Sequence, residues 1–172
     1  MIRPRLTCAR VACLVAALLA AAGCSHYGFS PSLRTGPRTV GVPVLGNDTL
    51  EYGAEQGVTD AIITTLTEDN SMRVVPEGEA EAIIRGRVTT YERPVFSYDA
   101  AGNPREYKVR VAADLSYEDR RAGTVIWEGK VEGWGVYAVS GEGGSPTTEE
   151  EARAAAFERL AQDLLSKTVQ GW

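Results

Sequence analysis

The sequence is poor in the side chains on which most catalytic and metal sites depend. It has one histidine, His26, and three cysteines among 172 residues. A Ser-His-Asp or Cys-His arrangement needs a histidine or an equivalent base beside the nucleophile, and a zinc site of the histidine type needs several such ligands. Because His26 is the only candidate, the sequence disfavours both kinds of site, and we expect neither an enzyme nor a bound cofactor.

A hydrophobic run long enough to cross a bilayer is also lacking. The apolar stretch Val11 to Ala22 is shorter than the roughly 20 residues that a transmembrane helix needs. Arg3, Arg5 and Arg10 come before or at its start, and no acidic residue accompanies them. A positive segment followed by a short apolar run is typical of a secretory signal peptide, which we place over residues 1–23.

The apolar stretch leads into Ala21-Ala22-Gly23-Cys24, which resembles the bacterial lipobox. In that motif the cysteine is acylated and becomes the new N-terminus, although Ala21 stands where leucine is usual. The resemblance implies a lipid anchor, such as palmitate, on Cys24. A plain signal site followed by a buried cysteine is the alternative. Ser25 stands where an aspartate would resemble the signal for retention in the inner membrane, so transfer to the outer membrane is implied.

Removal of the signal would also remove Cys8 and Cys13, and with Cys24 acylated the body would have no thiol for a disulfide. Removing three arginines leaves 15 basic against 23 acidic residues, so the net charge changes from −5 to −8. This charge disfavours non-specific binding to nucleic acids. Residues 24–38 lack periodicity and predict a tether, and residues 39–172 are enough for one domain.

Hydrophobic periodicity predicts the elements of that domain. We expect a short strand in Thr39–Leu45, a helix over Gly53–Asn70, strands over Ala80–Tyr91, Glu106–Glu118 and Thr124–Tyr137, and a second helix from a capping box at Thr148 and Glu151. The simplest fold is an α+β two-layer sandwich, with two helices on one face of a four-stranded, mostly antiparallel sheet. The side chains expected between the layers are Val109, Val111, Leu115, Val125, Trp127 and Val131 from the sheet, and Leu66, Leu160 and Leu164 from the helices.

Several motifs, in this order along the chain, resemble the LptE family of lipopolysaccharide-assembly lipoproteins. They are Gly23-Cys24-Ser25-His26-Tyr27-Gly28-Phe29, Val42-Pro43, Asn47 with Thr49, Glu55 with Thr59, the segment Tyr91–Val111, and "IWEGKVEG". The resemblance implies a lipid-anchored protein on the periplasmic side of the outer membrane. There it would plug and support a large β-barrel translocon, an LptD-like partner, and help deliver lipopolysaccharide. A generic lipoprotein scaffold for another envelope complex is the alternative.

Two further patterns in the sequence have features of enzyme sites. Gly141–Pro146 is rich in glycine, but no Gly-Lys-Ser/Thr follows and the next helix opens with three glutamates, so a surface loop is favoured over a phosphate loop. Asp99 with Glu106 could in principle form a glycosidase pair. Acidic residues are so abundant here that solvated surface is the better interpretation.

Four cations fall on the sheet face that the core assignment leaves outside: Arg85, Arg87, Lys108 and Arg110. Cross-strand ion pairing on a solvated face is the simplest interpretation. The alternative is contact with an anionic group, either lipopolysaccharide phosphates or acidic residues of the barrel. If these four cations do not bind an anionic group, we expect the contacts with lipopolysaccharide or the barrel in the loops 93–105 and 138–147.

Overall fold

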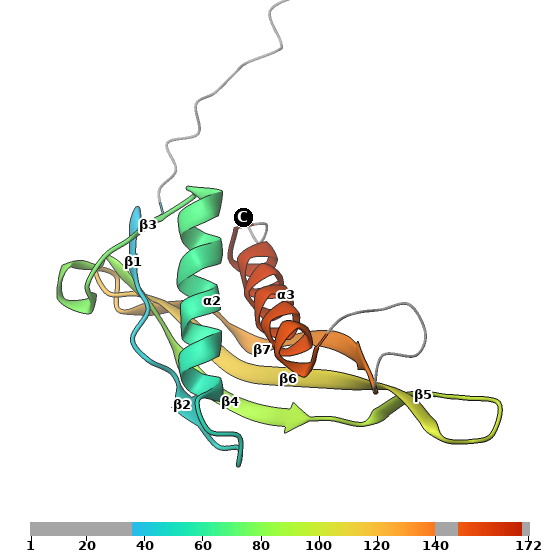
Figure 1. The fold of residues 1–172 in the computed structure, drawn as a ribbon. Coiled ribbons are helices and arrows are strands. Elements are labelled where there is room, and N and C mark those ends of the chain that lie inside the picture. The colour runs from blue at the N-terminus through green and yellow to red at the C-terminus, as the bar shows by residue number, and fades with distance from the viewer. Residues whose placement is uncertain (1–35, 140–147, 170–172) are drawn as a thin grey trace, which may run out of the picture. The chain divides into compact units, whose positions relative to one another are not determined.

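Two long antiparallel pairings form the centre of the sheet in the computed structural model, which describes residues 36–139 and 148–169 (Figure 1). Strand β6 (Pro104–Asp119) pairs on one side with β4 (Ala82–Glu92) and on the other with β7 (Thr124–Ala138). The three long strands predicted from alternation are thus confirmed. The signal segment, Cys24, His26 and the loop 141–147 lie outside the described residues.

The rest of the sheet departs from the predicted four antiparallel strands. Strand β1 (Thr39–Gly41) ends before Pro43 and runs parallel to both β4 and the two-residue β3 (Arg73–Val74). A second two-residue strand, β2 (Gly46–Asn47), also pairs in parallel with β4. The sheet is therefore mixed and has seven strands in the described part of the chain. Strands of two residues carry no periodicity, so the sequence pattern could not reveal them.

The segment 93–105, expected to be a loop, instead contains strand β5 (Val95–Tyr98), which pairs with the beginning of β6. Pro94 lies between β4 and β5, and because proline has no backbone N–H it interrupts the strand there. The turn after β5 is closed by Asp99, whose carboxylate accepts hydrogen bonds from the backbone N–H groups of Ala101 and Asn103. The resulting β5–β6 hairpin projects beyond the helices (Figure 1).

Both helices form where the sequence predicts them and cover the same face of the sheet (Figure 1). Helix α2 (Ala54–Asp69) ends at Asn70, whose φ of 55° is the left-handed conformation that often terminates helices. Helix α3 (Glu149–Val169) begins with the predicted capping box: Glu151 N–H donates to Thr148 Oγ1, and Thr148 N–H donates to the Glu151 carboxylate. A single-turn 3₁₀ segment, Glu77–Glu79, connects β3 to β4.

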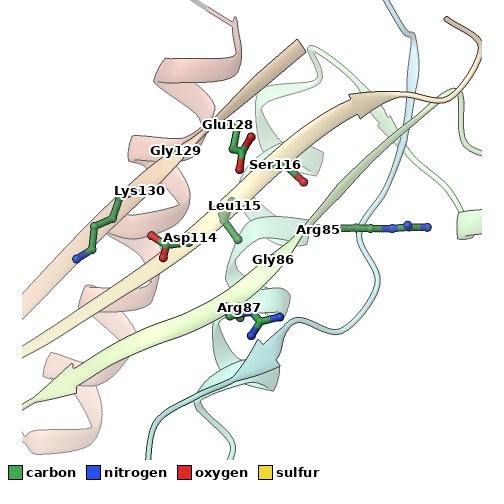
Figure 2. Close-up of a pocket in the computed structure, with 9 residues that line it drawn as sticks. All are labelled: Arg85, Gly86, Arg87, Asp114, Leu115, Ser116, Glu128, Gly129 and Lys130. Atoms are coloured by element: carbon green, nitrogen blue, oxygen red, sulfur yellow. The ribbon is translucent and has the colours of Figure 1, made fainter. Parts of the chain in front are cut away.

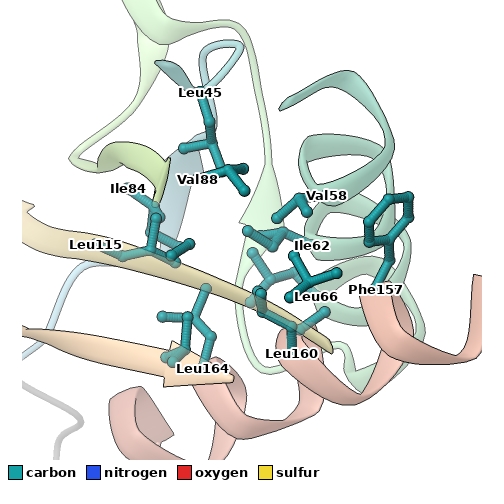
Figure 3. Close-up of a cluster of buried hydrophobic side chains, with 14 of the residues drawn as sticks. Leu45, Val58, Ile62, Leu66, Ile84, Val88, Leu115, Phe157, Leu160 and Leu164 are labelled. Carbon is teal, nitrogen blue, oxygen red and sulfur yellow. The ribbon is translucent and has the colours of Figure 1, made fainter. Parts of the chain in front are cut away.

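The core between the layers consists of the side chains that the alternation predicts (Figure 3). Val109, Val111 and Leu115 are buried on the sheet, and they meet buried leucines of both helices, Leu66, Leu160 and Leu164. Trp127 is partly buried against the same cluster, and Val131 is fully buried. The predicted face assignment is therefore confirmed for these positions.

Val125 is the exception, because it is 54% exposed instead of buried. The register between β6 and β7 shifts there: Tyr117 pairs with Trp127, but Glu118 pairs with Val125, which leaves Ile126 as an extra residue. A β-bulge of this kind moves every residue beyond it to the opposite face. Ile126, which simple alternation places outside, packs against the core instead.

Helix α3 lies directly on the backbone of β7. A Cβ atom at Gly133 or Gly135 would lie 1.9 Å from the carbonyl oxygen of Ala156 or 2.0 Å from that of Ala152. The two helices also meet closely, since a Cβ at Gly57 would lie 2.3 Å from the ring of Phe157. Glycine is required at these positions by close approach.

Side chains of α3 also reach the outer edge of β7. Arg159 donates to the carbonyl oxygen of Trp134, Asp163 accepts from the N–H of Glu132 at 3.2 Å, and Lys167 donates to the carbonyl oxygen of Lys130 at 2.8 Å. The three side chains are spaced four residues apart, so they follow one stripe of the helix. They satisfy backbone groups that an edge strand would otherwise leave to solvent.

Candidate functional site

The sheet face that α2 and α3 do not cover, called the outer face here, carries the four predicted cations. Their register separates them into two pairs. Arg85 and Arg87 lie on β4 opposite Ser116 and Asp114 of β6, whereas Arg110 lies opposite Glu92 near the far end of β4. The two positions on β6, Asp114 and Arg110, are four residues apart, which corresponds to about 13 Å. The structure therefore brings the cations to one face but not into one cluster.

Three of the four cations form ion pairs with carboxylates. Arg85 pairs with Glu77 at 2.5 Å, Arg87 pairs with Asp48 at 3.3 Å, and Arg110 pairs with Glu132 at 3.1 Å and Glu92 at 3.6 Å. All of these side chains are substantially exposed to solvent, so each pair contributes about 0 to 1 kcal/mol at most to stability. Their charges are nevertheless partly neutralised within the protein.

A surface hollow of about 400 Å³ lies on the outer face around Arg85 and Arg87 (Figure 2). Asp114 and Ser116 of β6 and Glu128 and Lys130 of β7 also line it. Carboxylates are thus interspersed with the cations, and the hollow has no strong excess of either sign. Such a lining favours mutual pairing and water over the binding of an isolated anion.

Lys108 has a different environment from the other three cations. Its ammonium group lies 4.8 Å from the ring centroid of Phe96 and 4.7 Å from that of Trp134. The guanidinium of Arg159, from α3, lies 4.0 Å from the centroid of Trp134. Cations are attracted to the negative faces of aromatic rings at such distances. Within residues 36–139 and 148–169, neither Lys108 nor Arg159 forms an ion pair with a carboxylate.

We call Phe96, Lys108, Trp134 and Arg159 the aromatic–cation cluster. Phe96 and Trp134 are 51% and 45% exposed, so their rings form part of the accessible outer face. Of these four residues, the sequence pattern predicts only Lys108 as a contact residue. Trp134 could have been found, since it alternates with the inward residues of β7. Arg159 could not, because it reaches the tryptophan from a helix 25 residues further along the chain.

A second ion-pair centre joins three elements at the start of both helices. Arg93 pairs with Glu51, before α2, and with Glu149, at the beginning of α3, both at 2.5 Å. Arg153 lies 3.9 Å from the same Glu51. The Arg93 guanidinium also lies 5.2 Å from the ring centroid of Tyr91, and burial raises the pKa of the Tyr91 hydroxyl. This centre links the beginnings of the helices to the junction of β4 and β5.

The structure does not support the alternative interpretation of Asp99 and Glu106 as a glycosidase pair. Asp99 is exposed, and hydrogen bonds from Asn103 lower the pKa of its carboxyl group, which is the reverse of what a general acid requires. Glu106 accepts a hydrogen bond from Ser97. In the described ranges, no group of three or more His, Cys, Asp or Glu residues is placed to hold a metal ion. No helix in that part of the chain is both long and apolar enough to span a membrane.

Comparison with known proteins places the chain in a structural and family context. A family model described as "LptE: Lipopolysaccharide-assembly" matches residues 37–169. A minor lipoprotein from Acinetobacter baumannii has a similar structure, with a TM-score of 0.51 and 12% identity, over 78% of this chain and 94% of that one. A protein from Xanthomonas campestris gives a TM-score of 0.50 and 12% identity, over 82% and 90% of the two chains. These likenesses concern the fold.

The rare lipoprotein B from Shewanella oneidensis is more distant in structure, with a TM-score of 0.43 and 17% identity over 77% of this chain and 97% of that one. No curated protein matches the sequence.

Proposed function

Because the chain belongs to the LptE family of lipopolysaccharide-assembly proteins, we propose that it is an outer-membrane lipoprotein that plugs and supports a large β-barrel translocon. The observation that carries this proposal is the family match across the α+β domain, joined to the lipobox-like Ala21-Ala22-Gly23-Cys24 at its N-terminal side. Large barrels enclose lumens wide enough to require a plug. The protein performs no chemical reaction in this role.

The anchor is proposed to be a lipid on Cys24. Stable membrane attachment requires more than one acyl chain or a second signal, and Cys24 is the acylation site that the lipobox resemblance implies. Cys24→Ser should therefore accumulate an unprocessed precursor or lose stable association with membranes. The measurement is fractionation of cells followed by detection of the protein and its mass. Normal processing and retention of the variant would contradict the lipobox interpretation.

The barrel partner can be tested by mild detergent extraction of membranes and identification of the proteins recovered with the wild-type chain. Recovery of an outer-membrane barrel that functions in lipopolysaccharide assembly is the expected result. Recovery of a different envelope complex, without such a barrel, would favour the generic scaffold instead. Many small α+β domains serve unrelated partners, so the fold alone does not decide between these outcomes.

We further propose that the outer face contacts anionic groups of lipopolysaccharide through Arg85, Arg87, Lys108 and Arg110. The ion pairs and ring contacts of these residues predict how much each contributes to binding. Lys108 should contribute most, together with Arg159, because no carboxylate neutralises either of them in the described part of the chain. Arg85, Arg87 and Arg110 must exchange an existing ion pair for a new one, so their net gain on binding is smaller.

Two sets of variants separate these contributions. Lys108→Gln combined with Arg159→Gln should weaken lipopolysaccharide binding about tenfold or more, because each lost charge-assisted hydrogen bond corresponds to roughly that factor, and raising the salt concentration should shrink the difference. Arg85→Gln with Arg87→Gln is the matched control of equal charge change and should have a smaller effect. An equal or larger effect of the control would refute the ranking. Unchanged binding in both sets at low salt would place the contacts elsewhere.

A further inference from the structure

The loop between β2 and α2 presents two apolar side chains almost completely to solvent. Leu50 and Tyr52 have relative exposures of 106% and 96%. Single exposed hydrophobic residues are common on protein surfaces and need no explanation. The unusual feature here is that the loop holding these two residues is fixed by a dense set of hydrogen bonds.

Asn47 is the centre of this set. Its side-chain amide donates to the carbonyl oxygen of Glu51 at 2.8 Å and to the carboxylate of Glu55 at 2.7 Å. Its side-chain oxygen accepts from both the N–H and the hydroxyl of Thr49, at 2.9 and 2.7 Å. The Thr49 hydroxyl in turn accepts from the N–H of Glu51 at 3.2 Å. The conformation of residues 47–52 is thus determined by its own side chains.

The loop is also tied to the elements around it. Before it, the N–H of Leu45 donates to the hydroxyl of the buried Thr59 on α2. Asp48 N–H donates to the carbonyl oxygen of Val88 on β4. The Glu51 carboxylate pairs with Arg93 and so connects to the start of α3. The loop therefore lies on a rigid base made of a strand and both helices.

This arrangement gives a structural meaning to four residues of the motifs that resemble the LptE family. They are Asn47, Thr49, Glu55 and Thr59. In the structure they form one hydrogen-bonded frame, which holds the chain on both sides of Leu50 and Tyr52. The frame stabilises the loop, but Leu50 and Tyr52 bury no surface in return.

We infer that Leu50 and Tyr52 are anchor residues that insert into apolar pockets of a protein partner. An anchor held in its bound conformation before binding loses little conformational entropy, which increases affinity. Large apolar or aromatic side chains at the centre of a contact, surrounded by a polar rim, are the usual energetic core of protein interfaces. This inference rests on the proposed function, in which the partner is the β-barrel translocon.

The charges around the loop favour a protein partner over a lipid surface. Asp48 and Glu149 are about half exposed, and Glu150 is exposed beside them. An anionic membrane surface would repel these carboxylates. The pairs Arg87–Asp48 and Arg93–Glu149 instead provide a rim of both signs, which a protein surface with complementary charges can match.

Site-specific photo-crosslinking tests the contact directly. A photoreactive amino acid placed at position 50 or 52 of the full-length chain should crosslink to the barrel in intact membranes. The same amino acid at position 125 is the matched control, because Val125 is an exposed apolar residue on β7. It should give no barrel crosslink. Crosslinks from positions 50 and 52 to lipid instead of protein would overturn the inference.

A second measurement uses recovery of the barrel by extraction. Leu50→Ser with Tyr52→Ser should reduce the recovered barrel about tenfold or more, as expected for two side chains that lose apolar burial, whereas Val125→Ser should not. If the wild-type chain and the double variant recover equal amounts, the inference is wrong while the proposed function stands. If even the wild-type chain recovers no barrel, the proposed function fails and the inference fails with it.

Discussion

Replacing Gly133 by alanine should destabilise the domain more than an ordinary surface substitution in a strand. The added Cβ would lie 1.9 Å from the carbonyl oxygen of Ala156 and 2.5 Å from the backbone nitrogen of Leu160. Since ordinary non-bonded contacts are about 3.5 to 4 Å, α3 would have to move away from β7 by about 1.5 Å. Overpacking typically costs 1 to 3 kcal/mol. Because the obstacle here is helix backbone, we expect about 3 kcal/mol.

Gly129→Ala is the matched control for this experiment, since it lies on the same strand and face. The three atoms nearest to its Cβ would all belong to the side chain of Trp127, the first at 3.0 Å. Because this side chain can shift slightly, the expected change is below about 1 kcal/mol. Urea denaturation followed by circular dichroism gives the free energy of unfolding of both variants. If the free energies of unfolding of Gly133→Ala and Gly129→Ala differ by less than about 1 kcal/mol, the close contact between the backbones of α3 and β7 would be refuted.

Two other predictions concern the core. Leu66→Ala, Leu160→Ala and Leu164→Ala should each lower the free energy of unfolding by about 2 to 5 kcal/mol, through lost burial and the cavity left behind, and small effects at all three in urea denaturation would contradict the packing of the layers. Burial raises the pKa of Tyr117 to about 12, and in the unfolded chain it is about 10. The buried neutral hydroxyl therefore contributes fully to the free energy of unfolding below pH 10. This contribution, up to about 3 kcal/mol, is lost between about pH 10 and 12. The decline in stability between pH 9 and 11.5 should be less steep in Tyr117→Phe, and an equal decline in both proteins would show that the Tyr117 hydroxyl does not contribute to it.

The sequence predicts correctly those parts of the fold in which a long strand or helix has one buried face and one exposed face. Alternation from Tyr107 to Tyr117 repeats over eleven residues, and only a half-buried strand produces such a pattern. The same holds for the helices, whose apolar stripes follow the helical period. Strands β2 and β3 have two residues each and are formed by pairing with β1 and β4. No local pattern encodes that pairing.

The candidate site was harder to predict, because its chemistry depends on contacts between distant segments. The sequence placed Arg85, Arg87, Lys108 and Arg110 on one face, but it could not show that Glu77 and Asp48 neutralise two of them. It also could not show that Lys108 lies against Phe96 and Trp134 instead of a carboxylate. The β-bulge at Ile126 similarly depends on the partner strand, and the periodicity of β7 alone gave the wrong face for Val125.

The hydrogen bonds from Arg159, Asp163 and Lys167 to β7 have a consequence for copies of the protein that lie close together. Unprotected edge strands of neighbouring molecules can join through their backbones and extend into a continuous aggregate. Here a strand approaching the edge of β7 would first have to displace the charged side chains that already bind Lys130, Glu132 and Trp134. Helix α3 thus allows a high local concentration of the lipoprotein without the growth of intermolecular sheets at this edge.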